Sequence, residues 1–214
     1  MKKSTIIVAH PDDETLWAGG TILSHPEWSW RIFALTRRSD PDRSSKFDKA
    51  LSYFGASGGM NDLNDDPDQK PLDPARVKKA VLEIIEETPG QEIVITHGPS
   101  GEYTRHLRHE EVCSAVTKMW IEGEIKSSQL WFFAYEDGNG DYLPRPEKGA
   151  ELFHLPPEIW DRKRHVVRNI YGFNSDSWES RASPRIEGFW KFKSRDNLNN
   201  WLNGSGYVEG SGTI

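Results

Sequence analysis

The chain has 214 residues, of which 36% are hydrophobic and 28% charged, and this suits one soluble globular domain better than two. Its net charge of −6 disfavours a general nucleic-acid-binding protein, which needs an excess of basic side chains. No apolar run approaches the roughly 20 residues of a membrane-spanning helix, and the short apolar stretch behind Met1 is too brief for a signal peptide, so we expect a cytoplasmic protein.

Strand and helix signals alternate along the first half of the chain. Runs of apolar and β-branched residues predict strands, whereas apolar residues at helical spacing predict helices. In chain order we expect a strand at 4–9, a helix at 15–24, a strand at 29–36, a helix at 44–54, a helix from 73–74 to 89–90, a strand at 92–96, a helix at 109–121 and a strand at 129–135. This alternation predicts a mostly parallel sheet flanked by helices, a Rossmann-like three-layer α/β sandwich.

The pattern weakens after about residue 137. We expect a helix at 157–171, whereas the last 30 residues or so are polar and aromatic and give no clear pattern. In this part, Trp178 and Trp190 are better candidates for a substrate wall than the tryptophans at core-like positions. The segment 61–71 is acidic, rich in turn residues and without periodicity, and it therefore predicts an exposed loop.

The first predicted strand ends in a cluster of one imidazole and three carboxylates, His10, Asp12, Asp13 and Glu14. Because chemistry on parallel sheets collects at the carboxyl ends of strands, this position favours a functional site. His10 and Asp13 are three residues apart and can face one ion, with Asp12 beside it. The alternative interpretation is a polar turn that only caps the next helix.

A second cluster, which contains His97, His106 and His109, follows the strand at 92–96. Both clusters should therefore meet at the same edge of the sheet. Either His106 or His109 would join His10 and Asp13 around one ion and leave the open position that a catalytic zinc needs. The alternatives are a loop residue for His106 and an exposed helix-start residue for His109. His97 is interpreted as a strand-end residue near the site and not as a ligand.

These clusters resemble motifs of the PIG-L/LmbE-like deacetylases, metal-dependent enzymes that remove acetyl groups from N-acetylglucosamine-type sugars. The motifs that carry the resemblance are His10-Pro11-Asp12-Asp13-Glu14, Gly19-Gly20, His106-x-x-His109 and Arg43-x-x-Lys46-x-x-x-Ala50-x-x-x-Phe54-Gly55. The resemblance covers residues 4 to about 135. It implies a single LmbE-like domain over 1–214, with its core at 4–135 and a C-terminal extension that shapes the substrate site.

The resemblance also implies a role for each residue of the site. The implied metal ligands are His10, Asp13 and His109. Asp12 is implied as the general base on a metal-activated water, and His106 as a stabiliser of the oxyanion or as an acid. Arg43 would hold a substrate hydroxyl or a phosphate-like group, and Glu14 would support the loop or a ligand. The implied metal is zinc (Zn²⁺), with ferrous iron (Fe²⁺) as the alternative, and the implied partner is a small N-acetyl sugar or glycoconjugate.

The chain departs from the family pattern around the second cluster. The family usually has Pro-Asp between its two histidines, whereas this chain has Leu107-Arg108. Tyr103 stands one residue further from His106 than the corresponding tyrosine of the family. Arg105 and Arg108 add two positive charges here, which hints at an acidic substrate such as a phosphorylated or carboxylated sugar.

Other functions remain as alternatives. Two histidines and a carboxylate also suit a non-haem iron(II) oxygenase, although such enzymes usually have antiparallel barrels. A protein of the same fold could bind metal without turnover, or act on another acyl-amide. Gly19-Gly20 lacks the GxGxxG spacing of a dinucleotide loop, so we reject that function. Formation of a homo-oligomer is left open.

Overall fold

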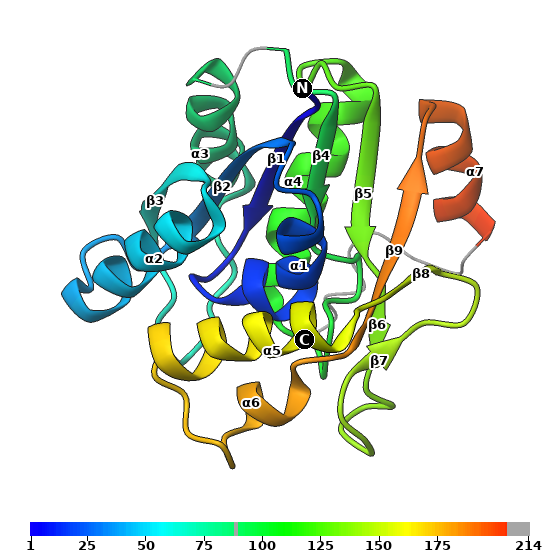
Figure 1. Cartoon of the computed structure of the whole chain (residues 1–214). Helices are drawn as coiled ribbons and strands as arrows, with labels where there is room; N and C mark the ends of the chain where they lie inside the picture. Colours follow the sequence, from blue (N-terminus) through cyan, green and yellow to red (C-terminus); the bar gives the residue numbers. More distant parts are fainter. Residues whose placement is uncertain (88–89, 205–214) are drawn as a thin grey trace.

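A seven-stranded sheet forms the centre of the protein (Figure 1). The computed structural model describes residues 1–87 and 90–204. The strands are ordered β3 (Ser57–Leu63), β2 (Ser29–Thr36), β1 (Lys3–Val8), β4 (Ile93–Thr96), β5 (Gln129–Phe133), β9 (Ile186–Phe192) and β8 (Glu151–His154). Strands β3 to β5 in this order are parallel, and β9 is antiparallel to both of its neighbours. A separate ribbon pairs β6 (Tyr135–Glu136) with β7 (Arg145–Pro146).

Helices cover both faces of this sheet (Figure 1). One face carries α1 (Asp13–Ser24), α2 (Pro41–Phe54), and α5 (Pro157–His165) with its π-helical continuation η1 (Val166–Ile170). The other carries α3 (Pro74–Glu87), α4 (Leu107–Glu122) and α7 (Arg195–Gly204). Neighbouring side chains of a strand point to opposite faces, so Ile6 packs in one core and Ile7 in the other. The prediction of a mostly parallel sheet between helical layers is confirmed.

The expected elements of the first half are present with shifted ends; the strand expected at 129–135, for example, ends at Phe133, and Tyr135 belongs to β6. Two differences are larger. Helix α2 begins at Pro41, earlier than expected, because the Asp40 side chain accepts the backbone N–H groups of Asp42 and Arg43. Strand β3 is not expected from the sequence, since Gly58 and its neighbours give no strand pattern. A Cβ at Gly58 would lie 1.7 Å from a backbone oxygen of β2, so this strand pairing requires glycine there. The expected helix stop at Pro89 lies outside the described residues.

The segment 61–71 is only in part the exposed loop that we expect from its composition. Residues 61–63 belong to β3, and Leu63 is buried in the second core. We call the remainder, up to Leu72, the 64–72 loop. Its acidic residues are mostly exposed, but the Asp65 side chain is 9% exposed and faces His10. The loop is therefore part of the wall beside the first histidine.

The C-terminal third completes the sheet and adds a short helix, α6 (Trp178–Ala182). The helix expected at 157–171 is present as α5 and η1, while β9 and α7 are elements that the sequence pattern does not predict. Glu187 of β9 is fully buried and accepts the backbone N–H groups of Gly20 and Thr21 in α1. Among the described residues, no helix combines the length and apolarity needed to cross a bilayer.

Candidate metal centre and active site

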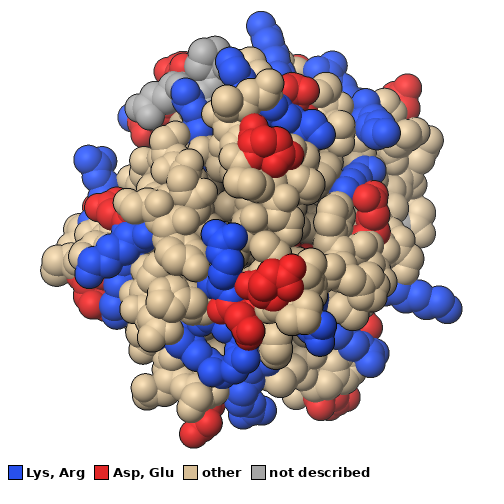
Figure 2. Space-filling view, viewed as in Figure 1, with Lys and Arg blue, Asp and Glu red and all other residues tan. Residues whose placement is uncertain are grey.

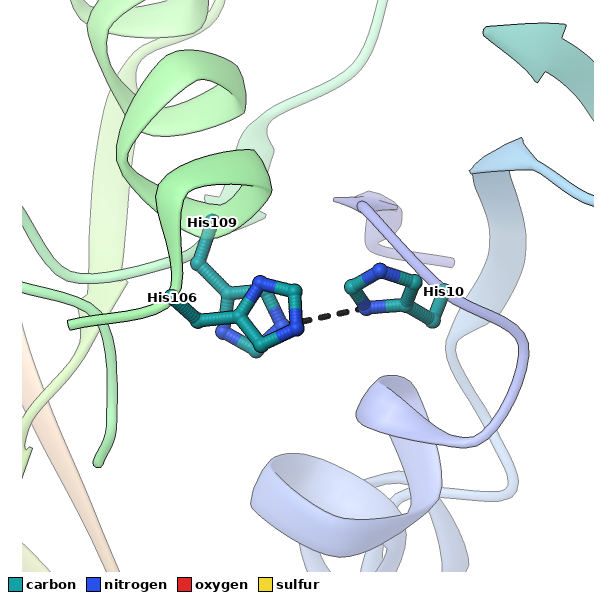
Figure 3. Close-up of side chains that lie close together, drawn as sticks. All are labelled: His10, His106 and His109. Carbon is teal, nitrogen blue, oxygen red and sulfur yellow. Dashed lines mark hydrogen bonds between the residues drawn. The ribbon is translucent and has the colours of Figure 1, made fainter. Parts of the chain in front are cut away.

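The candidate site lies where two adjacent parallel strands, β1 and β4, end. His10 follows β1, and His97 follows β4 directly. Figure 3 shows the His10 ring facing those of His106 and His109, which come from the beginning of α4. Because parallel strands bring their carboxyl ends to one edge, residues 99 positions apart in the chain become neighbours.

Three donor atoms form a small triangle at this edge. His10 Nδ1 lies 3.1 Å from Asp13 Oδ2 and 3.1 Å from His109 Nε2, and the third side, from His109 Nε2 to Asp13 Oδ2, is 3.3 Å. Ligands about 2.0 Å from a tetrahedral zinc ion are separated by about 3.3 Å, so these donors fit such an ion. Asp13 is 2% exposed and His109 is fully buried. The three implied ligands are thus close enough to share one cation.

The electrostatics of this triangle favour positive charge. Burial opposes a charge on His10, but the Asp13 carboxylate outweighs it and raises the pKa of His10 to about 8. Burial also opposes a charge on His109, but the Asp13 and Glu102 carboxylates outweigh it and raise the pKa of His109 to about 10. Carboxylates that draw protons onto two imidazoles provide the negative field that a divalent cation requires.

Glu102 is a buried carboxylate to which the sequence motifs assign no role. One of its oxygens lies 2.5 Å from His109 Nδ1 and 2.9 Å from His97 Nδ1, and the other accepts the Gly98 N–H at 2.8 Å. Burial disfavours its charge, but the two histidines outweigh this and lower the pKa of Glu102 to about 2. An ionised Glu102 holds a hydrogen of His109 on Nδ1, so that Nε2 is the nitrogen that can give up its proton and bind a cation in the triangle.

His97 also lies beside Asp13 and His109, but both of its ring nitrogens are already used. Its Nε2 accepts the Ala9 N–H at 2.8 Å, and its Nδ1 contacts Glu102. The ring stacks on that of His109 with 3.8 Å between centroids. His97 therefore supports the position of His109 and connects it to the end of β1.

Asp12 has an unusual backbone conformation, with φ 124° and ψ −27°. Its N–H donates to Glu14 Oε2 at 3.0 Å, and Glu14 Oε1 accepts the Tyr171 hydroxyl at 2.7 Å. Such a conformation is costly for a residue other than glycine and persists only where surrounding contacts enforce it. Here the buried Glu14 carboxylate supplies that contact by accepting the Asp12 N–H. The conformation places the Asp12 side chain beside the triangle of donor atoms.

The Asp12 carboxylate is held beside the triangle by a cation. Its Oδ2 lies 3.1 Å from Nη1 of Arg43, which projects from α2. Burial and the adjacent Asp13 raise the pKa of Asp12, while Arg43 counteracts them. A carboxyl group under these opposing influences is suited to accept and return a proton.

His106 lies against the two other histidines of Figure 3. Its ring centroid is 4.4 Å from that of His109 and 4.7 Å from that of His10. Burial and these neighbours lower the pKa of His106 to about 3, so the ring is neutral at pH 7. Its buried Nδ1 has no hydrogen-bond partner among the described residues. A neutral imidazole in this position can offer one N–H to an incoming group.

Of these site residues, His10, Asp12, Asp13, Arg43 and His106 line a cavity of about 290 Å³, whereas His109 and Glu102 do not. The rest of its lining consists of Pro11, Leu16, Arg37, Asp65, Pro67, Gln69, Tyr103, Trp178 and Glu179. Trp178 lines the cavity and packs on Tyr103 with 4.5 Å between ring centroids, and its contact with a substrate stays a prediction. Trp190 instead packs on Trp201 and does not line this cavity.

The two arginines of the second cluster do not line the cavity. Arg105 pairs with Glu110 at the surface, and Arg108 is buried with its guanidinium against Glu111. The structure therefore gives no support to an acidic substrate on the basis of these two charges. On the face shown in Figure 2, acidic and basic side chains are interspersed.

The fold and the cluster define an α/β protein with a histidine–carboxylate centre at the carboxyl edge of its sheet. Residues 5–120 match the family PIG-L: GlcNAc-PI de-N-acetylase. The match spans more than half of the chain, and the protein belongs to this family. Among curated protein sequences, no relative matches the chain at a significant level.

Several solved structures share this fold. A deacetylase of teicoplanin biosynthesis has a TM-score of 0.66 at 14% identity, covering 91% of this chain and 100% of its own. The N,N'-diacetylchitobiose deacetylase from Pyrococcus horikoshii has a TM-score of 0.64 at 15% identity, covering 90% and 84%. GalB, the 4-carboxy-2-hydroxymuconate hydratase from Pseudomonas putida, has a TM-score of 0.61 at 15% identity, covering 98% and 92%. At such identities the likeness concerns the fold, and the reaction must be argued from the site.

Proposed function

We propose that the protein is a zinc-dependent hydrolase that removes an acetyl group from an N-acetylated amino sugar or a related glycoconjugate. The observation that carries the proposal is the triangle of His10, Asp13 and His109 donors with the Asp12 carboxylate beside it. Membership of the family described as GlcNAc-PI de-N-acetylase supports this reaction, as do neighbours named as deacetylases. Ferrous iron is the alternative metal, since one neighbour is described as a zinc-inhibited form of teicoplanin deacetylase.

The proposed reaction assigns a task to each residue around the cavity. The bound metal would polarise the amide carbonyl and acidify a water. Asp12 takes the proton from the attacking water and later returns it to the leaving amine. The neutral His106 donates its N–H to the carbonyl oxygen as negative charge develops there. Arg43 holds Asp12 in place and offers its remaining N–H groups to a substrate hydroxyl.

The charges of the cavity support a neutral sugar as the substrate. Arg43 is paired with Asp12, and Arg37 is paired with Asp65 and Asp40. Both arginines of the cavity are thus already paired with carboxylates, and neither is left over to bind an anionic group of the substrate. A cavity of about 290 Å³ is of the size of one sugar ring, and the Trp178 and Tyr103 rings offer an apolar wall for its C–H groups.

Acetate release from a panel of sugars tests this function. We expect the zinc- or iron-loaded protein to deacetylate neutral N-acetylglucosamine or its β-linked dimer faster than N-acetylglucosamine 6-phosphate. The variant Asp12→Asn should retain the metal and lose roughly 10²- to 10⁴-fold in kcat, because it removes the base. Asp66→Asn, an exposed change in the 64–72 loop, is the matched control.

Three results would contradict the proposal. Release of no acetate from any N-acetyl sugar by the metal-loaded protein would remove the deacetylase function. A near-normal rate for Asp12→Asn would remove Asp12 as the base. Stoichiometric metal in His109→Ala would show that His109 is not a ligand, since loss of one of three protein ligands should abolish tight binding.

A further inference from the structure

Arg108 stands between the two histidines of the second cluster, and its side chain is 1% exposed. An arginine is almost never fully buried unless its guanidinium is completely paired. Here Nε donates to the Asn64 carbonyl at 2.7 Å, Nη2 donates to the Lys70 carbonyl at 2.7 Å, and Nη1 contacts Glu111 Oε2 at 2.6 Å. The guanidinium thus spans the two sides of the 64–72 loop.

Glu111 extends the same attachment. Its Oε2 accepts Arg108, and its Oε1 accepts the N–H of Leu72 at 2.7 Å. Arg108 and Glu111 lie on the first turns of α4, on either side of His109 in the sequence. Together these two side chains fix the 64–72 loop, at its beginning and at two points near its end, to the helix that carries His109.

The loop in turn brings Asp65 to the other implied histidine ligand. Asp65 Oδ1 lies 3.2 Å from His10 Nε2 and 3.0 Å from Nε2 of Gln69, and Arg37 Nε donates to Oδ2 at 3.2 Å. A carboxylate that accepts the Nε2 hydrogen of His10 leaves the lone pair of Nδ1 facing Asp13 and His109. Asp65 therefore determines which nitrogen of His10 is available as a ligand.

We infer that Arg108 is a positioning residue, which clamps the 64–72 loop to α4 so that Asp65 orients His10 for metal binding. The inference rests on the proposed metal centre and extends it to residues outside the family motifs. It also gives a role to Arg108, which stands where the family usually has an aspartate. Its buried guanidinium connects α4, the helix that carries His109, to the loop whose Asp65 orients His10.

Zinc affinity of the purified protein, measured by competition with a chromophoric chelator, tests this inference without any substrate. We expect Asp65→Asn and Arg108→Met each to weaken zinc binding by roughly 10- to 100-fold. Removing a positive charge near a cation site would by charge alone strengthen binding, so a loss in Arg108→Met must come from positioning. The matched control for Asp65→Asn is Asp66→Asn, and that for Arg108→Met is Arg105→Met. Each control makes the same charge change close by, and its zinc affinity should stay within about twofold of the unaltered protein.

Two further measurements separate positioning from a general loss of stability. Hydrogen exchange should accelerate in peptides covering residues 64–72 of Arg108→Met but not of Arg105→Met. The double variant Asp65→Asn with Arg108→Met should bind zinc about as weakly as either single variant, because both changes interrupt one path. If Arg108→Met does not fold, Arg108→Lys replaces it. It should still weaken zinc binding, because lysine lacks the planar fork that reaches three partners, but by less than Arg108→Met, because lysine keeps the positive charge.

The inference is wrong if Arg108→Met, or Arg108→Lys in its place, binds zinc as tightly as Arg105→Met, or if the losses in the double variant add. A protein that binds zinc in this pattern but releases no acetate would refute the proposed function and leave the inference standing. A wild-type protein that binds no zinc would overturn the inference together with the metal centre.

Discussion

Asp12 illustrates how a single backbone conformation controls the candidate site. A positive φ of 124° at an aspartate costs on the order of 1–3 kcal/mol. The conformation is maintained by the Glu14 carboxylate, which accepts the Asp12 N–H and is itself fixed by the Tyr171 hydroxyl. Tyr171 directly follows the π-helix η1, a helix type that often occurs at functional sites. The position of the proposed base therefore depends on a side chain 157 residues from Glu14.

We predict that Tyr171→Phe will lower kcat by roughly 10- to 100-fold, because Glu14 and with it Asp12 shift from their positions. KM and zinc affinity should stay within about twofold. The matched control is Tyr135→Phe, which also removes a buried hydroxyl bonded to α1, at Trp17. Both variants should lose about 1–3 kcal/mol of unfolding free energy, but only the first should lose turnover. Equal losses of kcat in the two variants would mean that Tyr171 has a structural role alone.

The residues of the site differ in how far they could be predicted from sequence. His10, Asp12 and Asp13 stand in one short run after a strand, so local spacing alone indicates a shared site. Glu102 belongs to the second cluster, seven residues before His109, and an acid that close to a candidate ligand was the available signal. Asp65 and Tyr171 gave no such signal, because their contacts with His10 and Glu14 exist only after the chain folds.

At the scale of elements, α1 is fixed at its middle as well as at its beginning. Glu187 of β9 accepts two backbone N–H groups of the helix and the Thr21 hydroxyl, and it pairs with Lys163 of α5 at 2.8 Å. A Cβ at Gly20 would lie 2.3 Å from Leu155, so glycine permits this close approach. The Gly19-Gly20 pair thus serves the packing of α1 against the C-terminal third.

We predict that Lys163→Met will lower the free energy of unfolding by about 3–5 kcal/mol, because it leaves the buried Glu187 without its counterion. Lys191→Met provides the control, since it removes a similar pair whose Glu151 partner is mostly exposed. That change should cost at most about 1 kcal/mol. Denaturant unfolding measures both values, and equal losses would show that the buried pair makes no special contribution.

Strand β9 shows why the last part of the fold could not be predicted. Its sequence places Glu187 and Gly188 in the middle of a strand, where both are unfavourable by propensity. Glu187 is tolerated there because Lys163 and the α1 amides satisfy its charge, and those partners are remote in sequence. Strands β1, β2 and β4, by contrast, were predictable from the local sequence. Parallel strands that are buried on both faces are continuous apolar runs.

At the scale of the whole molecule, Asp137 connects the segment before His106 with the loop after β6. It accepts the N–H of Thr104 at 2.7 Å and the Thr104 hydroxyl at 2.6 Å. Although burial works to raise the pKa of Asp137, these hydrogen bonds lower it below the usual value. A carboxyl whose pKa is lowered by folding adds stability above its unfolded pKa of about 4, and this stability is lost as the pH falls through the lower folded value.

We predict that Asp137→Asn will lower the free energy of unfolding at pH 7 by about 1–2 kcal/mol. The difference from the unaltered protein should shrink as the pH falls from about 4 toward 2, where both forms lack a charge at this position. Asp141→Asn, in the same loop and exposed, should have little effect at any pH. Urea unfolding over a pH series checks this, and a difference that stays constant with pH would contradict it.

The residues in and around the cavity come from separate elements of the fold. His10, Asp12 and Asp13 follow the end of β1 and His109 lies at the beginning of α4, whereas Trp178 and Glu179 come from the short helix α6. The two α6 residues that would contact the proposed substrate can therefore be exchanged without changing the proposed metal ligands or base. Efforts to direct the proposed reaction to other acylated compounds should therefore begin at α6.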